Sequence, residues 1–195
     1  MKMLKELYVQ ILPHPIALAT RLRGLHLIDV SIPEKRLVET LKKFPMLDEL
    51  EISRCTHVYQ YNIVERVGKA CPQLKSFIFD NAAYVPSLLE CNDVAALAIA
   101  KHFKQLRRLR LFANRLTSIG LFAIIDNCLD LEYLDIRYCF NVNFLDGSLK
   151  NKCVRIKELR MPNDSIADYE YRFDEDVAKG SYLNLYSSDT EYYCM

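Results

Sequence analysis

The stretch CLDLEYLDIRYC, residues 128–139, carries the pattern that decides the fold. Leu131, Leu134 and Ile136 follow the spacing L-x-x-L-x-L, and a cysteine stands three residues before and three residues after this triple. Apolar residues that alternate with polar ones are typical of a short strand with one buried face. The stretch therefore predicts one strand, set between two cysteines that occupy fixed positions beside it.

The apolar triple recurs along the chain. Seven copies can be phased, and their first residues are separated by 18, 25, 27, 32, 25 and 25 residues. The copies are Leu4/Leu7/Val9, Leu22/Leu25/Leu27, Leu47/Leu50/Ile52, Leu74/Phe77/Phe79, Leu106/Leu109/Leu111, Leu131/Leu134/Ile136 and Ile156/Leu159/Met161. A period of about 25 residues is that of leucine-rich repeats.

The residues that flank the triples are more specific than the triples, because apolar triples also arise by chance in a chain that is 51% hydrophobic. Three residues before each of the last five triples stand Phe44, Cys71, Phe103, Cys128 and Cys153. Three residues after a triple stand Cys55, Asn114 and Cys139, at the Asn/Cys position of the repeat consensus. These flanks make the repeat the preferred interpretation.

Five of the seven cysteines thus occupy repeat positions, and we expect them to be small buried thiols. If the residues between Cys128 and Cys139 are mostly extended, at about 3.3 Å per residue, these cysteines lie too far apart for a disulfide. Cys91 and Cys194 have no neighbour at zinc spacing. An odd cysteine count without close pairs indicates a reducing compartment, so we expect cytoplasmic and/or nuclear localisation.

The spacers between the triples have helical patterns. Residues 32–44 place Leu37, Leu41 and Phe44 on one helical face, and residues 116–128 open with the capping residues Thr117 and Ser118. Each unit is therefore a strand, a turn and a helix. The predicted fold is α/β: a leucine-rich-repeat solenoid, which is a right-handed β-α superhelix with a curved parallel sheet and helices on the convex side.

We assign this solenoid to residues 1–161, with about six to seven repeats, of which the first is irregular. Residues 162–195 differ in composition. They hold eight acidic and two basic residues, a net charge of −6, and six of the twelve tyrosines. We expect them to form a disordered acidic tail.

Composition and motifs argue against several classes of function. The formal net charge is +1, and no apolar run approaches the roughly 20 residues of a membrane span, so we expect no nucleic-acid or membrane partner. The sequence has no phosphate-cradling glycine loop, no nucleophile elbow and no paired histidines. We therefore expect neither an enzyme nor a cofactor or metal site.

Strand alternation places one set of polar and aromatic residues on the concave face of two neighbouring strands. The candidate partner-binding residues are Arg108, Arg110, Phe112, Tyr133, Asp135 and Arg137, called the patch below. Arginine and aromatic side chains are common anchors of protein interfaces and suit an acidic or phosphorylated segment. The alternative is a solvated face on which Arg110 and Asp135 neutralise each other across strands. The acidic tail is a rival ligand, because its charge favours folding back onto the arginines.

The stretches CLDLEYLDIRYCFNV, LTSIGLFAIIDNC and RIKELRMPNDS, with the Tyr- and Asp-rich tail, resemble plant F-box/leucine-rich-repeat proteins, in particular the group named as Skp-interacting partners. The resemblance covers about residues 20–175. It implies a protein-interaction scaffold like the substrate-recognition part of an SCF-type ubiquitin ligase, which holds a protein client on its concave face and feeds ubiquitin-dependent degradation.

The resemblance covers the repeats and the start of the tail, and we expect no F-box helices before the first triple at Leu4. We also expect the family's adaptor-binding residues to have no counterparts in this sequence. We therefore expect a Skp adaptor and cullin partner only if an F-box is supplied elsewhere. The alternative is a binding module without an F-box, which acts as a decoy or inhibitor outside a ligase.

Overall fold

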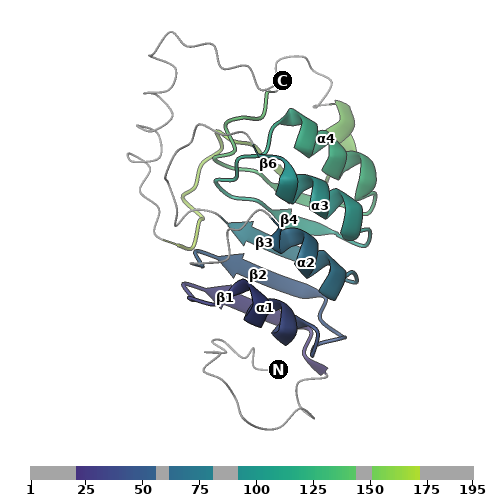
Figure 1. Cartoon of the computed structure of the whole chain (residues 1–195). Helices are drawn as coiled ribbons and strands as arrows, with labels where there is room; N and C mark the ends of the chain where they lie inside the picture. Colours follow the sequence, from purple (N-terminus) through teal and green to yellow (C-terminus); the bar gives the residue numbers. More distant parts are fainter. Residues whose placement is uncertain (1–20, 56–61, 81–91, 144–150, 172–195) are drawn as a thin grey trace.

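The computed structural model describes residues 21–55, 62–80, 92–143 and 151–171 of the 195-residue chain. They form one six-stranded parallel sheet with the strands in sequence order (Figure 1). The strands are β1 Gly24–Ile28, β2 Glu49–Ser53, β3 Ser76–Asp80, β4 Arg108–Arg110, β5 Tyr133–Asp135 and β6 Glu158–Arg160. The helices between them are α1 Glu34–Leu41, α2 Ile63–Ala70, α3 Val94–His102 and α4 Ser118–Asn127, and the 3₁₀ helix Cys153–Arg155 precedes β6.

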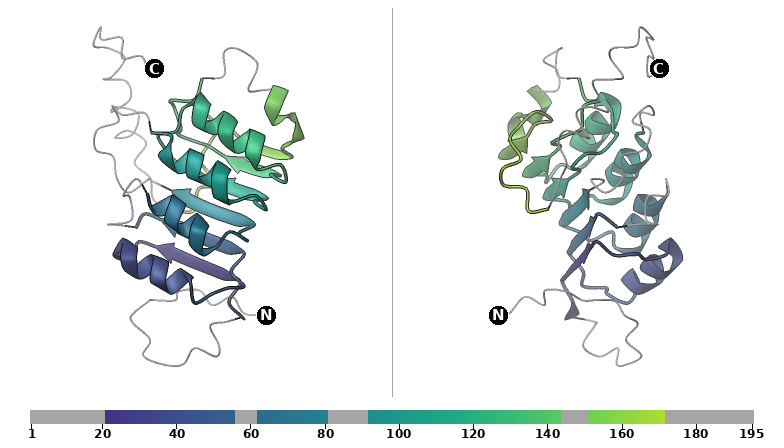
Figure 2. Two further views of the ribbon diagram at one scale, coloured as in Figure 1. Left: turned by 45° about the vertical axis from the view of Figure 1, so that its right-hand side comes forward. Right: turned by 90° about the vertical axis from the view of Figure 1, so that its left-hand side faces the viewer.

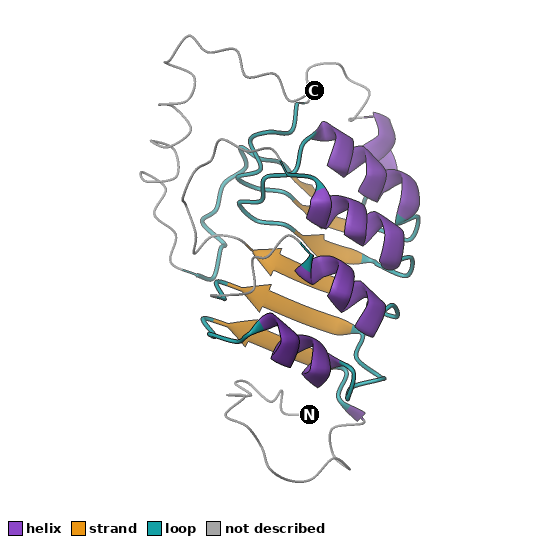
Figure 3. Ribbon diagram, viewed as in Figure 1, coloured by secondary structure: helices purple, strands orange, loops and turns teal. Residues whose placement is uncertain are grey.

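Helices α1 to α4 lie on one face of the sheet, and each contacts the next along the chain (Figure 3). We call the opposite face the open face. Parallel strands need crossover connections, and α1 to α4 and the 3₁₀ helix lie in the five connections between neighbouring strands. The α/β class and the parallel sheet agree with the prediction.

Six of the seven predicted triples coincide with strands, and the first, at residues 4–9, lies outside the described residues. The register aligns equivalent residues, so that Leu50 lies beside Phe77 and Phe77 beside Leu109. Each strand therefore adds its apolar residues to the same row, and the rows face the helices.

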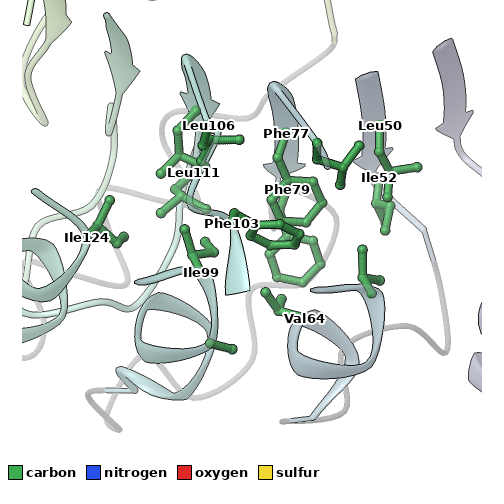
Figure 4. Packing of buried hydrophobic residues seen from close by; sticks show 14 of the residues in the cluster. Leu50, Ile52, Val64, Phe77, Phe79, Ile99, Phe103, Leu106, Leu111 and Ile124 are labelled. Atoms are coloured by element: carbon green, nitrogen blue, oxygen red, sulfur yellow. The ribbon is translucent and has the colours of Figure 1, made fainter. Parts of the chain in front are cut away.

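The core fills the space between the sheet and the helices (Figure 4). Phe77 on β3 and Phe103 after α3 are fully buried, with ring centroids 5.1 Å apart. Val64 from α2 and Ile99 from α3 close the same layer. Burial of each such side chain contributes about 1.5–3 kcal/mol relative to exposure. The buried residues form one cluster that continues from one unit to the next.

The Phe/Cys position before each of the last five triples lies in a turn, and its side chain is buried. After α4, the Cys128 amide donates to the Ile124 carbonyl at 2.8 Å, and the Leu131 amide donates to the Cys128 carbonyl at 3.2 Å. Cys71 and Phe103 make equivalent bonds after α2 and α3. The side chain at this position lies under the helix end, where only an apolar group fits.

The Asn/Cys position after the triple follows a second repeated turn. The residue before it has a positive φ in four units, at Asp29, Arg54, Ala113 and Tyr138. In two units the cysteine that follows donates its thiol to the preceding strand's unit: Cys55 Sγ to the Leu27 carbonyl at 3.2 Å, and Cys139 Sγ to the Leu111 carbonyl at 2.8 Å. These thiols cross-link neighbouring units by hydrogen bonds.

The described chain continues past the last strand, β6, into the segment predicted as the acidic tail. Residues 163–171, called the strap below, run along the open face, as the yellow-green segment in the right panel of Figure 2 shows. The strap contacts side chains of this face through hydrogen bonds to Arg110 and Arg137. Their acidic and tyrosine side chains meet opposite charges and an aromatic ring there, which holds them on the sheet. The remainder of the predicted tail, residues 172–195, lies outside the described residues.

Candidate functional site

The register of β4 and β5 brings the predicted patch together. Arg108 lies beside Tyr133, and Arg110 lies beside Asp135. Phe112 and Arg137 continue the same alternation two residues beyond the ends of β4 and β5. All six residues therefore belong to neighbouring positions of one face, as the alternation predicts.

Their exposure divides the patch into two parts. Arg108 is exposed and Tyr133 is partly buried. The other four are buried, with exposed fractions of 8% for Arg110, 0% for Phe112, 0% for Asp135 and 2% for Arg137. An ordinary solvated face does not account for these values, because the strap covers this part of the sheet.

Arg110 lies in a group of three carboxylates. Its guanidinium is 2.8 Å from Asp80 and 3.4 Å from Glu51, both on earlier strands, and 2.7 Å from Glu170 of the strap. The alternative interpretation of the patch paired Arg110 with Asp135. In the structure the Arg110 side chain extends toward β3 and β2 and pairs with Asp80 and Glu51. Asp135 instead pairs with Arg137.

The second arginine, Arg137, is fixed by Asp135. The carboxylate accepts bonds from the Arg137 amide at 3.1 Å, from Nε at 3.0 Å and from Nη2 at 2.7 Å. The remaining nitrogen, Nη1, donates to the Ser165 carbonyl at 2.8 Å and to Asp168 at 2.6 Å. One side of the guanidinium thus belongs to the sheet, and the other binds the strap.

An aromatic cluster lies between the two arginines. The Tyr169 ring stacks on Phe112 with centroids 4.0 Å apart and an interplanar angle of 9°, and Tyr138 packs against the same Phe112 ring. Tyr171 meets Tyr169 edge-on, and the Arg110 guanidinium lies 5.5 Å from the Tyr169 centroid. A cavity of about 460 Å³ lies between these strap tyrosines and the loop after β5.

Both strap tyrosines donate hydrogen bonds to sheet carboxylates. Tyr169 Oη lies 3.3 Å from Asp80, and Tyr171 Oη lies 2.6 Å from Glu51. Burial is the main cause of a raised pKa for each tyrosine, and the facing carboxylates add to it. Both hydroxyls therefore stay protonated at neutral pH and act as donors.

Both members of the Arg110–Asp80 pair have a raised pKa, which favours a neutral carboxyl on Asp80 but a charged guanidinium on Arg110. Burial raises the pKa of the Asp80 carboxyl to about 7, although Arg110 opposes the rise. Burial lowers the pKa of Arg110, but Asp80 and Glu170 outweigh this and raise it overall. We favour the ionised pair, because both Asp80 oxygens accept hydrogen bonds, from Arg110, from the Phe112 amide and from Tyr169. Such a buried pair fixes geometry more than it adds stability.

Outside the strap, the exposed part of the patch is organised by a cation–π contact. The Arg108 guanidinium lies 4.0 Å from the centroid of the Tyr133 ring. The Tyr133 hydroxyl lies 3.4 Å from Asp135, which links this pair to the Arg137 centre. Arg108 and Tyr133 therefore form an accessible rim beside the covered residues.

The sequence analysis did not identify Glu51 and Asp80 as the carboxylates that bind Arg110 and the strap tyrosines. Both occupy alternating open-face positions, yet they are buried at 4% and 0% exposure. Glu51 also accepts bonds from Ser53 at 2.8 Å and from His26 at 2.7 Å. The available signal was that acids on β2 and β3 occupy the cross-strand positions that carry arginines on β4 and after β5.

The cysteine prediction is confirmed for the described positions. Five cysteines are free and buried there: Cys55, Cys71, Cys128, Cys139 and Cys153. Cys91 and Cys194 lie outside the described residues. In the described part of the chain, we find no group of three or more His, Cys, Asp or Glu side chains placed to hold a metal ion, and no helix long and apolar enough to span a membrane.

Comparison with known proteins finds relatives among plant F-box proteins. The putative F-box/LRR-repeat protein 22 of Arabidopsis thaliana is 39% identical over 183 residues, which cover 89% of this chain and 58% of the relative. F-box protein SKIP19 of the same plant is 39% identical over 178 residues, which cover 89% of this chain and 56% of that protein. The resemblance to plant F-box/LRR-repeat proteins is confirmed.

A third F-box/LRR relative, the putative F-box/LRR-repeat protein 21 of Arabidopsis thaliana, is 39% identical over 163 residues, or 76% of this chain and 52% of the relative. The chain spans about half the length of the curated F-box/LRR relatives it matches. No family model matches the chain.

Proposed function

We propose that the chain is the client-binding part of an F-box-type substrate receptor, which presents a protein client to an SCF-type ubiquitin ligase for ubiquitin-dependent degradation. In this proposal the stacked units are a leucine-rich-repeat solenoid with the open face as its concave surface. The chain acts as an adaptor in the cytoplasm and/or nucleus, not as an enzyme. Its identity of 39% to proteins named as F-box/LRR proteins supports this role.

The observation that carries the proposal is the fixed orientation of two arginines on a sheet face without helices. Asp135 holds Arg137, and Asp80 with Glu51 holds Arg110, before any partner arrives. A side chain that is already ordered loses less conformational entropy when it binds. Arg108 and Tyr133 extend this surface with an exposed charge and a half-buried ring, the residue types that often anchor interfaces.

The ligase role requires an F-box, because that element contacts the Skp adaptor in proteins of this kind. The proposal holds whether the F-box belongs to the same polypeptide or is supplied by a partner. The repeats contribute client binding in either case.

Affinity purification from plant cells tests the role in two separate readouts. We expect the tagged protein to co-purify the Skp adaptor and a cullin, and to co-purify client proteins whose abundance rises when the proteasome is inhibited. An Arg108→Glu variant should recover roughly tenfold less client, the effect of losing an interface anchor worth about 1.4 kcal/mol. The adaptor signal should not change, because Arg108 belongs to the client surface.

The matched control is Lys43→Glu, the same charge reversal at an exposed position after α1. It should leave client and adaptor recovery unchanged. Client recovery without adaptor or cullin would contradict the ligase role and favour the decoy or inhibitor module. Equal client recovery by the Arg108 variant and the wild type would remove the patch from the proposal.

A further inference from the structure

The strap binds the open face mainly through side chains. Asp168 bridges two arginines, with 2.6 Å to Arg137 and 2.7 Å to Arg160, and Glu170 lies 2.7 Å from Arg110. Asp168 and Glu170 are 52% and 49% exposed. Exposed ion pairs contribute about 0–1 kcal/mol each, so these contacts give selectivity more than tight binding.

The strap alternates acidic and aromatic residues over Asp168-Tyr169-Glu170-Tyr171, and each has its own place on the sheet. The acids meet arginine nitrogens that the sheet carboxylates leave available: Nη1 of Arg137 for Asp168 and Nη1 of Arg110 for Glu170. Tyr169 stacks on the Phe112 ring between them. We call Arg110, Phe112, Arg137 and Arg160 the strap site.

The strap has the features of a bound peptide rather than of a further repeat. It adopts no strand of its own between residues 163 and 171. Its contacts reach far along the sequence, from Glu170 to Arg110 and from Tyr171 to Glu51. A tethered segment binds at a high effective concentration, so even weak contacts keep it in place. The same tether lets a stronger ligand of equal chemistry replace it.

We propose that the strap site binds an acidic, tyrosine-containing segment of a partner protein, and that the strap occupies the site in cis until such a segment displaces it. This inference rests on the proposed function, because it specifies the client chemistry that the open face accepts. The alternation of acids and tyrosines in the strap gives the partner's pattern: a carboxylate, an aromatic ring, a carboxylate and an aromatic ring.

Fluorescence anisotropy with a labelled peptide of the strap sequence, NDSIADYEY, tests the proposal on the full chain. The Asp168→Asn/Glu170→Gln variant weakens the strap while leaving the strap site intact. If the strap covers the site about nine-tenths of the time in the wild type, the variant should bind the peptide roughly tenfold more tightly. Added salt should weaken this binding, because the contacts are partly exposed ion pairs.

Two matched controls separate specific binding from non-specific attraction. A peptide with Asn and Gln in place of its Asp168 and Glu170 equivalents should bind the variant several-fold more weakly. Arg160→Gln, added to the variant, removes an arginine with a 40% exposed side chain and should also weaken binding several-fold without unfolding the chain.

Equal peptide affinity for the wild type and the strap variant would overturn the occupancy in cis. Equal affinity of the acidic and neutral peptides would overturn the recognition of carboxylates. Neither result depends on the Skp adaptor, so co-purification of adaptor and cullin can succeed while the strap proposal fails. The reverse outcome, peptide binding without the adaptor, would leave the strap site standing and remove only the ligase role.

Discussion

Arg137 is a buried charge on the open face, and its bonds to Asp135 compensate that charge. Both residues are almost inaccessible, at 2% and 0% exposure. Removing one partner of a buried pair typically costs about 3–5 kcal/mol, because the other charge is left without compensation. The pair therefore acts as a unit, and its energetic effect depends on both members.

We expect Arg137→Met to lower the free energy of unfolding by about 3–5 kcal/mol, since Asp135 then lacks its main counter-charge. Adding Asp135→Asn to this variant should recover part of the loss. Urea unfolding of the two single variants and the double variant gives the coupling energy. Strictly additive losses would mean that the two side chains do not depend on each other.

The buried thiols should be chemically slow. Burial raises the pKa of Cys55, Cys71 and Cys128 to about 11, so little thiolate exists near pH 8. Maleimide labelling of native protein, read by peptide mass spectrometry, should modify these three only after long incubation. All seven cysteines should react after denaturation. Rapid native labelling of Cys128, or a disulfide at any of the three, would contradict their buried positions.

His26 gives the open face a pH-dependent element. Its hydrogen bond to Glu51 is the main cause of its raised pKa, and Glu49 at 3.5 Å adds to the effect. The folded protein thus holds the imidazole proton more tightly than the unfolded chain. The stability it contributes is complete below the unfolded pKa of 6.5 and is lost as the pH rises through the higher folded pKa.

Urea unfolding across about pH 6 to 8 tests this. The free energy of unfolding should fall more with rising pH in the wild type than in His26→Gln. His102 is the contrast, because burial lowers its pKa, and His102→Gln should not reduce that fall. The same slope in wild type and His26→Gln would exclude His26 as its source.

The turn and helix that follow β4 show how a unit is closed. Thr117 caps α4 by accepting a bond from the Ile119 amide at 3.1 Å, and its hydroxyl donates to Asp93 at 2.7 Å. Asp93 also accepts from the Thr117 amide, which ties the start of α3 to the start of α4. A Cβ on Gly120 would overlap this carboxylate and lie 2.8 Å from the Ala96 Cβ. The helices therefore meet where one of them has no side chain.

Replacing Thr117 by Ala should cost about 1–2 kcal/mol, because both the cap and the bond to Asp93 are lost. Thr117→Ser keeps the hydroxyl and should cost much less. The midpoints of urea unfolding give the difference in the free energy of unfolding between the two variants, provided that their m-values are equal. A serine variant as unstable as the alanine variant would show that the hydroxyl bonds do not carry the effect.

The elements were predictable where a local pattern reports on burial. The triples located six strands, and the Phe/Cys flanks located the turns after the helices. The positive φ at Tyr138 and equivalent positions was not predictable, because bulky residues rarely adopt it. The turn is imposed by the stacking of units and not by the residue itself.

The placement of the patch residues on one face was predictable, but the pairing of their side chains was not. Strand alternation placed Arg110 and Arg137 on one face correctly, because side chains alternate with period two. Which carboxylate each arginine binds depends on side-chain direction across strands. The partner Glu170 lies 60 residues further along the chain. No local pattern encodes such a contact.

At the scale of the whole molecule, negative charge is concentrated in the C-terminal part of the chain. The formal net charge is +1, although residues 162–195 alone carry −6. The strap is the first part of this acidic region, and its acids lie on the arginines of β4, β6 and the turn after β5. The strap, which is the described part of this acidic region, therefore contacts the open face of the sheet through these ion pairs.

Hydrogen–deuterium exchange of the full chain, read for the amides of residues 163–171, tests the claim that the strap lies on the open face most directly. The Tyr169 amide bonds to Ile166 and the Asp164 amide bonds to Met161. We predict that these two amides exchange at least about tenfold more slowly than in the isolated peptide. The Asp168→Asn/Glu170→Gln variant should lose most of this protection. Exchange at the free-peptide rate in the wild type would contradict the account, because the strap would then not be bound to the sheet.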